Sequence, residues 1–158
     1  MGLTSQLRCP SAQPGMRDLK VLGVVERTEE GPRVASLRED VAASAPLLEE
    51  AKPLRPTEVF RMTAVCEHQR CVHFSGNRCE LAGRVVSILP AVVDALPVCM
   101  IRAECRWFAQ EGRAACLRCP QVVTESTDAS EDFVRAARPS RHTPIPLVAI
   151  DDADDSRP

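Results

Sequence analysis

The chain has 158 residues, among them eight cysteines, thirteen prolines, four phenylalanines, one tryptophan and no tyrosine. A core with so few large aromatic side chains buries little apolar area, so we expect a metal or disulfide staple to supplement hydrophobic packing. No apolar run is long enough to span a membrane, and a formal net charge of −2 gives no case for nucleic-acid binding. We therefore expect neither a membrane nor a nucleic acid as a partner.

The N-terminal segment indicates the compartment of the protein, and the charge distribution describes the surroundings of its cysteines. Met1–Pro10 has one arginine and no apolar stretch, which is not typical of a secretory signal, so we expect a cytoplasmic protein. In that reducing compartment clustered cysteines bind metals or do redox chemistry more often than they form disulfides. Residues 1–65 have no net charge, residues 66–119 carry +2, and residues 120–158 carry −4. Seven of the eight cysteines lie in the basic middle segment.

The first half of the chain predicts a small antiparallel sheet. Residues 1–17, with two prolines and two glycines, are typical of a flexible leader. The next segments are β-branched or alternate polar and apolar residues, with turn residues between the first two. The predicted strands are Lys20–Glu26, Arg33–Leu37 and Thr57–Val65, with a turn at Glu29–Pro32 and a short helix over residues 39–51.

The second half predicts helices. Residues 79–89 place Leu81, Val85, Ile88 and Leu89 on one helical face. Pro90 interrupts this pattern, and we expect either a kinked helix or two short helices, the second over residues 91–96. Further helices are predicted over residues 102–110, with Gly112 as the C-terminal cap, and over residues 131–137.

These elements predict an α+β fold, in which a small N-terminal antiparallel sheet is followed by a cysteine-rich, metal-stapled helical half and a disordered acidic tail. The tail is rich in Pro, Asp, Arg and Ser from residue 138 onward, which is typical of disorder. The predicted organisation is a flexible leader over residues 1–17, a single metal-binding domain over residues 18–125 and a mostly disordered acidic tail over residues 126–158.

The cysteine spacing is the main functional signal. Seven thiols within 54 residues are hard to explain as ordinary packing. The pair Cys116 and Cys119 can reach one metal centre from a single turn, and Pro120 follows directly, as in many iron–sulfur sequences. The predicted metal ligands are Cys66, Cys71, Cys79, Cys99, Cys105, Cys116 and Cys119.

Several ligand sets are compatible with this spacing. Adding His73 gives eight ligands for two sites, whereas adding Cys9 gives two [4Fe–4S] clusters if the leader folds back. Alternatively, the last four cysteines hold one cluster, and the first three bind zinc with a histidine or leave an iron position open. The Cys-Pro ending, the absence of zinc-ribbon spacing and Trp107 as apolar shielding favour an iron–sulfur cluster, most simply [4Fe–4S]. The two histidines, His68 and His73, and the small size favour zinc.

The sequence favours a binding function over catalysis. It contains no phosphate-binding loop, dinucleotide-binding loop or nucleophile elbow, and we assign no catalytic residue. We expect a metal-binding protein that acts in electron transfer, in redox sensing or as the accessory partner of a larger enzyme. The alternatives are a zinc-stabilised interaction module and a thiol oxidoreductase that uses Cys116 and Cys119. Nearby arginines can offset the charge of a metal–thiolate site; these are Arg70, Arg78, Arg102, Arg106, Arg113 and Arg118.

Five blocks of sequence resemble a known family. They are Cys9–Ala12, Pro56–Arg61, Leu89–Pro97, Cys105–Gly112 and Cys116–Thr124. Together they are similar to a family of small, uncharacterised, cysteine-rich bacterial proteins, whose cyanobacterial members are often labelled "nitrogen fixation protein" and some of which lie near peptide natural-product gene clusters. The resemblance covers roughly residues 9–137. It implies that Cys9 belongs to the motif set, but it implies no mechanism.

Overall fold

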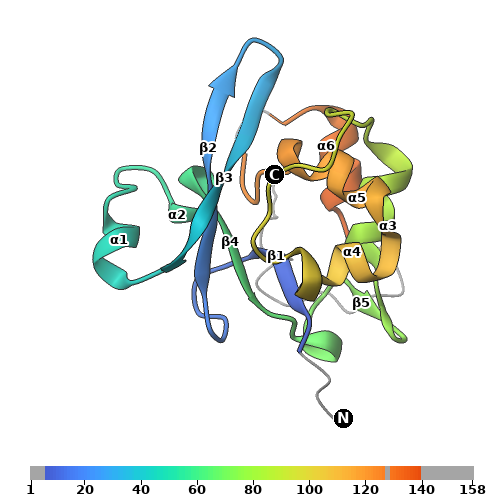
Figure 1. Ribbon diagram of the computed structural model, residues 1–158, viewed down its shortest axis with the longest axis horizontal. Helices are drawn as coiled ribbons and strands as arrows, with labels where there is room; N and C mark the ends of the chain where they lie inside the picture. Colours follow the sequence, from blue (N-terminus) through green and yellow to red (C-terminus); the bar gives the residue numbers. More distant parts are fainter. Residues whose placement is uncertain (1–5, 127–128, 140–158) are drawn as a thin grey trace, which may run out of the picture.

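The computed structural model describes residues 6–126 and 129–139. Its largest element is a four-stranded sheet in which every neighbouring pair of strands is antiparallel (Figure 1). The strand order is β1-β4-β2-β3, and the strands are β1 (Arg8–Ala12), β2 (Lys20–Thr28), β3 (Gly31–Ala42) and β4 (Phe60–Val65). The predicted N-terminal antiparallel sheet is therefore confirmed.

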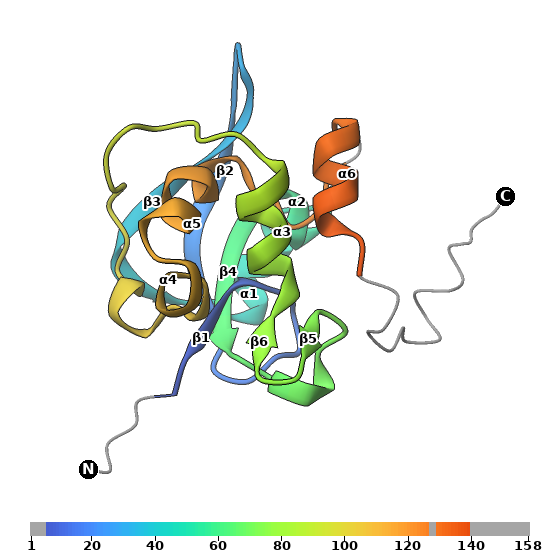
Figure 2. The same ribbon diagram turned by 90° about the vertical axis from the view of Figure 1, so that its right-hand side faces the viewer.

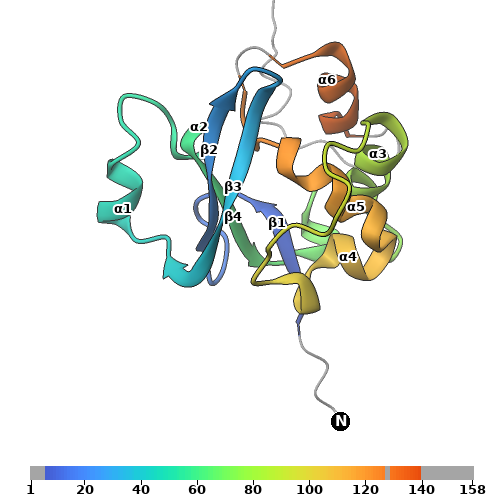
Figure 3. The same cartoon turned by 45° about the horizontal axis from the view of Figure 1, so that its top comes forward.

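The central strand β4 separates two apolar cores. Because successive side chains on a strand point to opposite faces, Phe60, Met62 and Ala64 share one face. They pack in a core with the short helices α1 (Ala45–Glu49) and α2 (Pro56–Val59). Figure 3 shows these helices on one side of the sheet and the remaining helices on the other. Arg61 and Thr63 consequently point toward the helical half.

The helical half forms the second core around Trp107, which is 1% exposed. Figure 2 shows its helices in front of the sheet, with a small hairpin beside α3. An α+β arrangement with the sheet first and the helices later is confirmed. The elements are η1 (His68–Arg70), the hairpin β5 (Phe74–Ser75) and β6 (Arg78–Cys79), α3 (Glu80–Ile88), η2 (Arg102–Glu104), α4 (Arg106–Glu111), α5 (Arg113–Arg118), η3 (Cys119–Gln121) and α6 (Glu131–Ala137).

Two of the predicted helices differ from the structure because of prolines. Residues 39–42 continue β3, paired with β2, and α1 begins only at Ala45. A helix over residues 39–51 would place Pro46 in its interior, where proline has no N–H to donate, whereas Ser44 caps the helix that does form. Residues 91–96 contain no helix, because Leu89 is extended before Pro90 and the chain continues irregularly.

The two ends of the domain also differ from the predicted boundaries. Part of the predicted leader forms β1, which pairs with β4. The helix predicted over residues 131–137 is α6, which lies within the segment assigned to the acidic tail. The rest of that predicted tail, residues 140–158, lies outside the described residues. None of the helices in the described part of the chain has the length and apolarity needed to cross a membrane.

Gly23 allows the β2–β3 pair to approach closely, next to a register shift in β2. A Cβ atom at this position would lie 2.7 Å from the carbonyl oxygen of Ala35 and 2.7 Å from Cγ1 of Val34. We expect Gly23→Ala to lower the free energy of unfolding by about 1–3 kcal/mol, because the backbone must move to relieve the overlap. Urea denaturation of the full chain measures this change.

Gly83→Ala is the matched control. Gly83 lies in α3, and the nearest atom to its added Cβ would be the end of the Arg78 side chain at 3.5 Å. Alanine is the better helix former, so this substitution should leave stability unchanged or raise it by up to about 1 kcal/mol. Equal losses of stability in the two variants would contradict the close-approach explanation.

Candidate metal centres

The eight cysteines are all free thiols, and they gather into two groups of four. Burial first, and then charge repulsion from nearby thiols, raises the pKa values of five cysteines, and the repelling thiols are their neighbours. The five are Cys9, Cys71, Cys79, Cys99 and Cys105. The first thiol group contains Cys9, Cys66, Cys71 and Cys79. The second thiol group contains Cys99, Cys105, Cys116 and Cys119.

Pairing of β1 with β4 completes the first thiol group. Cys9 lies opposite Ala64 in this pair, and Cys66 follows β4 directly. The backbone N–H of Cys66 donates to the carbonyl of Leu7 at 3.0 Å, which fixes the two cysteine-bearing segments side by side. Cys9 and Cys66 are 57 positions apart in the chain, and they are neighbours because β1 pairs with β4.

A small hairpin supplies the other two thiols of the first group. Cys71 follows η1, and Cys79 pairs with Phe74 across β5 and β6 before it caps the N-terminus of α3. Three of the four cysteines line an open cavity of about 1430 Å³, which includes its mouth; these are Cys9, Cys71 and Cys79.

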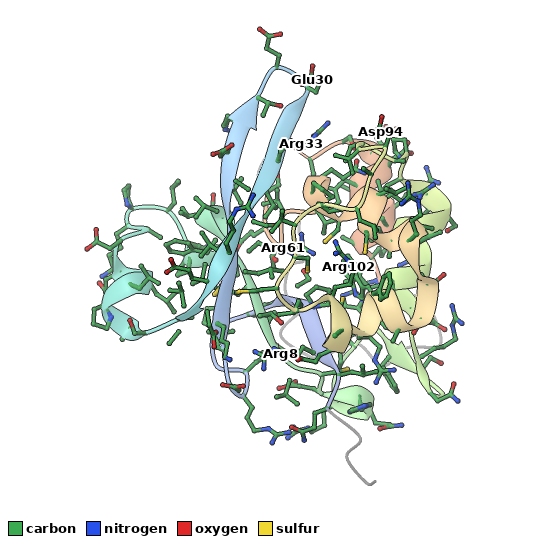
Figure 4. All side chains as sticks on the ribbon, viewed as in Figure 1. Arg8, Glu30, Arg33, Arg61, Asp94 and Arg102 are labelled. Atoms are coloured by element: carbon green, nitrogen blue, oxygen red, sulfur yellow. The ribbon has the colours of Figure 1, made fainter. Side chains whose placement is uncertain are left out.

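The second thiol group is built from the helices that follow residue 98. Cys99 precedes η2, Cys105 precedes α4, Cys116 lies in α5 and Cys119 begins η3. All four line one cavity between the sheet and the helices, with about 520 Å³ of empty space when its open mouth is included. Arg61 and Arg102 also line it, and Figure 4 shows both of them in this region.

Backbone N–H groups donate hydrogen bonds to three sulfur atoms of the first thiol group. Each donor comes two or three residues after the cysteine, and Cys71 and Cys9 each accept at 3.4 Å. Hydrogen bonds of this kind stabilise negative charge on sulfur and tune metal–thiolate centres. The bonds run from Ser11 to Cys9, from His73 to Cys71 and from Ala82 to Cys79.

Burial keeps several of these thiols protonated while no cation is bound. It raises the pKa of Cys9 and of Cys105 to about 12, and it also raises the pKa values of Cys71, Cys79 and Cys99. A thiol with a raised pKa is a weak nucleophile, so these five positions do not suit thiol catalysis. These positions can bind a metal cation, which displaces the thiol protons when it binds.

The guanidinium of Arg61 is the principal positive charge at the second thiol group. Its side chain is 1% exposed and lies 5.5 Å from the ring centre of Trp107. It donates to the sulfur of Cys119 at 3.0 Å and to the carbonyls of Cys119 at 2.9 Å, Val122 at 2.8 Å and Pro10. No carboxylate among residues 6–126 and 129–139 forms an ion pair with it.

The structure uses both candidate histidines for other contacts. Nδ1 of His73 lies 2.8 Å from Nη2 of Arg84, and because arginine only donates, this nitrogen is the acceptor. Burial, with a smaller effect from Arg84, lowers the pKa of His73 to about 4, so the ring is neutral. His68 is exposed and packs its ring edge-on against Phe74, with 5.3 Å between ring centres.

The seven predicted ligands therefore divide into three and four, and Cys9 makes the first set four. No three donor side chains in the described part of the chain converge closely enough to hold a single metal ion. Sequence reasoning left Cys9 open, although the eight-cysteine count and the family resemblance both pointed to it. It missed Arg61, because an arginine in an alternating strand normally indicates a solvent-facing side.

Comparison of the chain with known protein families, curated proteins and solved structures finds no match. The resemblance to the cysteine-rich bacterial family therefore stays a prediction.

The metal-free, reduced protein should lose stability as the pH rises from about 9 toward 12. Thiols in the unfolded chain ionise near their ordinary pKa of 9.0, whereas Cys9 and Cys105 hold their protons to about 12 when folded. The folded state binds more protons in this window, so each thiol lowers the free energy of unfolding by up to about 1.4 kcal/mol per pH unit. Urea titrations across the window measure the slope.

Cys9→Ala is the control for this prediction. It removes one of the two most strongly shifted thiols, so the pH slope should become shallower by that thiol's contribution. The same slope in the variant and the original protein would contradict the assignment of the buried thiols as its source.

Proposed function

We propose that the protein is a metal–thiolate protein with two centres, each a [4Fe–4S] cluster held by one thiol group. The observation that carries this proposal is the division of eight free cysteines into two sets of four. Four thiolates are the usual ligand set of a [4Fe–4S] cluster. Residues Cys9, Cys66, Cys71 and Cys79 hold one cluster, and Cys99, Cys105, Cys116 and Cys119 hold the other.

Charge supports an anionic occupant of the second cavity. A buried guanidinium without a carboxylate partner is costly unless another negative charge compensates it. Among the described residues, Arg61 has only carbonyl oxygens and the sulfur of Cys119 as hydrogen-bond acceptors. Four thiolates around a cluster carry net negative charge, so the occupied site supplies the missing counter-charge.

Two features support a cluster over a single zinc ion. The last cysteine is followed directly by Pro120, as in many iron–sulfur sequences. Both candidate histidines, which would favour zinc, make other contacts, His73 with Arg84 and His68 with Phe74.

The chemistry that such clusters supply is one-electron transfer. We therefore assign the protein a role as a cytoplasmic electron carrier or redox sensor that serves a larger protein partner. A catalytic role is less well supported at Cys9, Cys71, Cys79, Cys99 and Cys105, because burial raises the pKa values of these five thiols and makes them weak nucleophiles.

Anaerobic purification should yield a brown protein with about eight iron and eight sulfide per chain, as two [4Fe–4S] clusters require. Mössbauer and absorption spectroscopy identify the cluster type. A colourless protein with stoichiometric zinc and no sulfide, obtained under the same anaerobic conditions, would overturn the proposal in favour of a zinc-stabilised module.

Substitution by serine tests the division into two groups. Cys9→Ser and Cys71→Ser should each lose about half of the iron, and Cys116→Ser should lose the other half, because each change removes one thiolate from a single centre. The double variant Cys71→Ser/Cys116→Ser should lose nearly all of it. Ser87→Ala on α3 is the control and should keep the full complement. Full iron content in Cys9→Ser would exclude Cys9 as a ligand.

A further inference from the structure

The two thiol groups lie against the same indole ring. Trp107 lines the cavity of the first group and also the cavity of the second. It is 1% exposed, and its Nε1–H has no acceptor among the described residues. One aromatic side chain thus forms a wall common to both sites.

The backbone also joins the two groups directly. Arg8 forms a bridge with Cys105 of the second group, and the next residue in the chain is Cys9 of the first group. Gln110 of α4 accepts from the N–H of Cys79 and donates to its carbonyl, each at 2.7 Å. Strand β1 and helix α4 therefore hold the two sites in fixed proximity.

The two sites differ in their charged neighbours. Glu67 and Arg70 line the first cavity, so their charges offset each other. Arg61 and Arg102 line the second cavity, and no acidic residue does so among the described residues. Both sites have hydrogen bonds to sulfur, from backbone N–H groups at the first and from Arg61 at the second. The positive charge at the second site therefore distinguishes them, because it stabilises the reduced form of a cluster, which carries one more negative charge.

We propose that the protein is an internal electron relay, in which the centre of the second thiol group has the more positive reduction potential and accepts electrons from the first across Trp107. This inference rests on the proposed function. In each step one electron leaves the centre of the first group and enters the centre of the second. The first centre is oxidised and the second reduced by one unit, and no proton moves and no bond forms or breaks.

The test is an anaerobic redox titration of the full chain, followed by EPR. Two separate one-electron reductions are expected. Cys71→Ser should retain only the more positive one and Cys116→Ser only the more negative one, and either variant alone assigns the order. Retention of the more positive reduction in Cys116→Ser would overturn the relay direction.

Arg102→Gln tests the charge explanation. It should move the reduction of the second centre to more negative potential and leave the other in place. Arg55→Gln is the matched control, because it removes the same charge from a side chain that is 73% exposed and pairs with Glu125. Neither reduction should move in the control. Equal shifts of both reductions in Arg102→Gln would overturn the assignment.

The EPR spectrum of the fully reduced protein tests, without any substitution, whether both centres lie beside Trp107. Two paramagnetic centres that share one ring should broaden or split each other's EPR signals, and each single-cluster variant should give a simple spectrum. Absence of this interaction would overturn transfer across Trp107. A protein without iron and sulfide would refute the proposed function itself, whereas a two-cluster protein with the reverse order of potentials would refute only the relay.

Discussion

The buried guanidinium of Arg61 is the interaction on which the arrangement of the molecule depends. It extends from the central strand β4 and binds carbonyls of β1 and of the segment around η3, the sulfur of Cys119 and the face of Trp107. Desolvating such a cation costs several kcal/mol, which the hydrogen bonds offset only in part. Negative charge in the adjacent cavity would offset the rest of this desolvation cost. The stability of the sheet–helix interface therefore depends on the charge state of the second thiol group.

The composition of the chain explains why the interface between sheet and helices contains a cavity beside Arg61. Trp107 is the only tryptophan, and the core around it includes small residues such as Ala82, Ala115 and Ala136. A core of this kind leaves space that larger aromatic side chains would fill elsewhere. In this protein the space lies beside the cysteines. The same shortage of apolar bulk that weakens hydrophobic packing leaves open space beside both thiol groups.

Local patterns in the sequence predicted those parts of the fold that depend on local interactions. β-Branched residues indicated β2, and the apolar face of residues 79–89 indicated α3. Strand β1 was missed because its sequence, Arg-Cys-Pro-Ser-Ala, has no β-branched residue, and its pairing with β4 is a long-range interaction. The place of Cys9 in the first group follows from that pairing, so spacing along the chain left this residue open. Arg61 was missed for a related reason, because only the tertiary fold covers its side of the sheet.

The two thiol groups also differ in how they must assemble. Cys99 to Cys119 span 21 residues, so the second group closes a short loop at small entropic cost. The first group needs Cys9 beside Cys66, and therefore requires the β1–β4 pair and most of the sheet to be in place. Loops of this length close late because their contacts are non-local. The four thiols of the first group thus come together only in a chain whose N-terminal strand has already paired with the sheet. The second group meets the sheet through Arg61, which donates to the sulfur of Cys119, and through the bridge between Arg8 and Cys105. Both thiol groups therefore depend on β1 and β4.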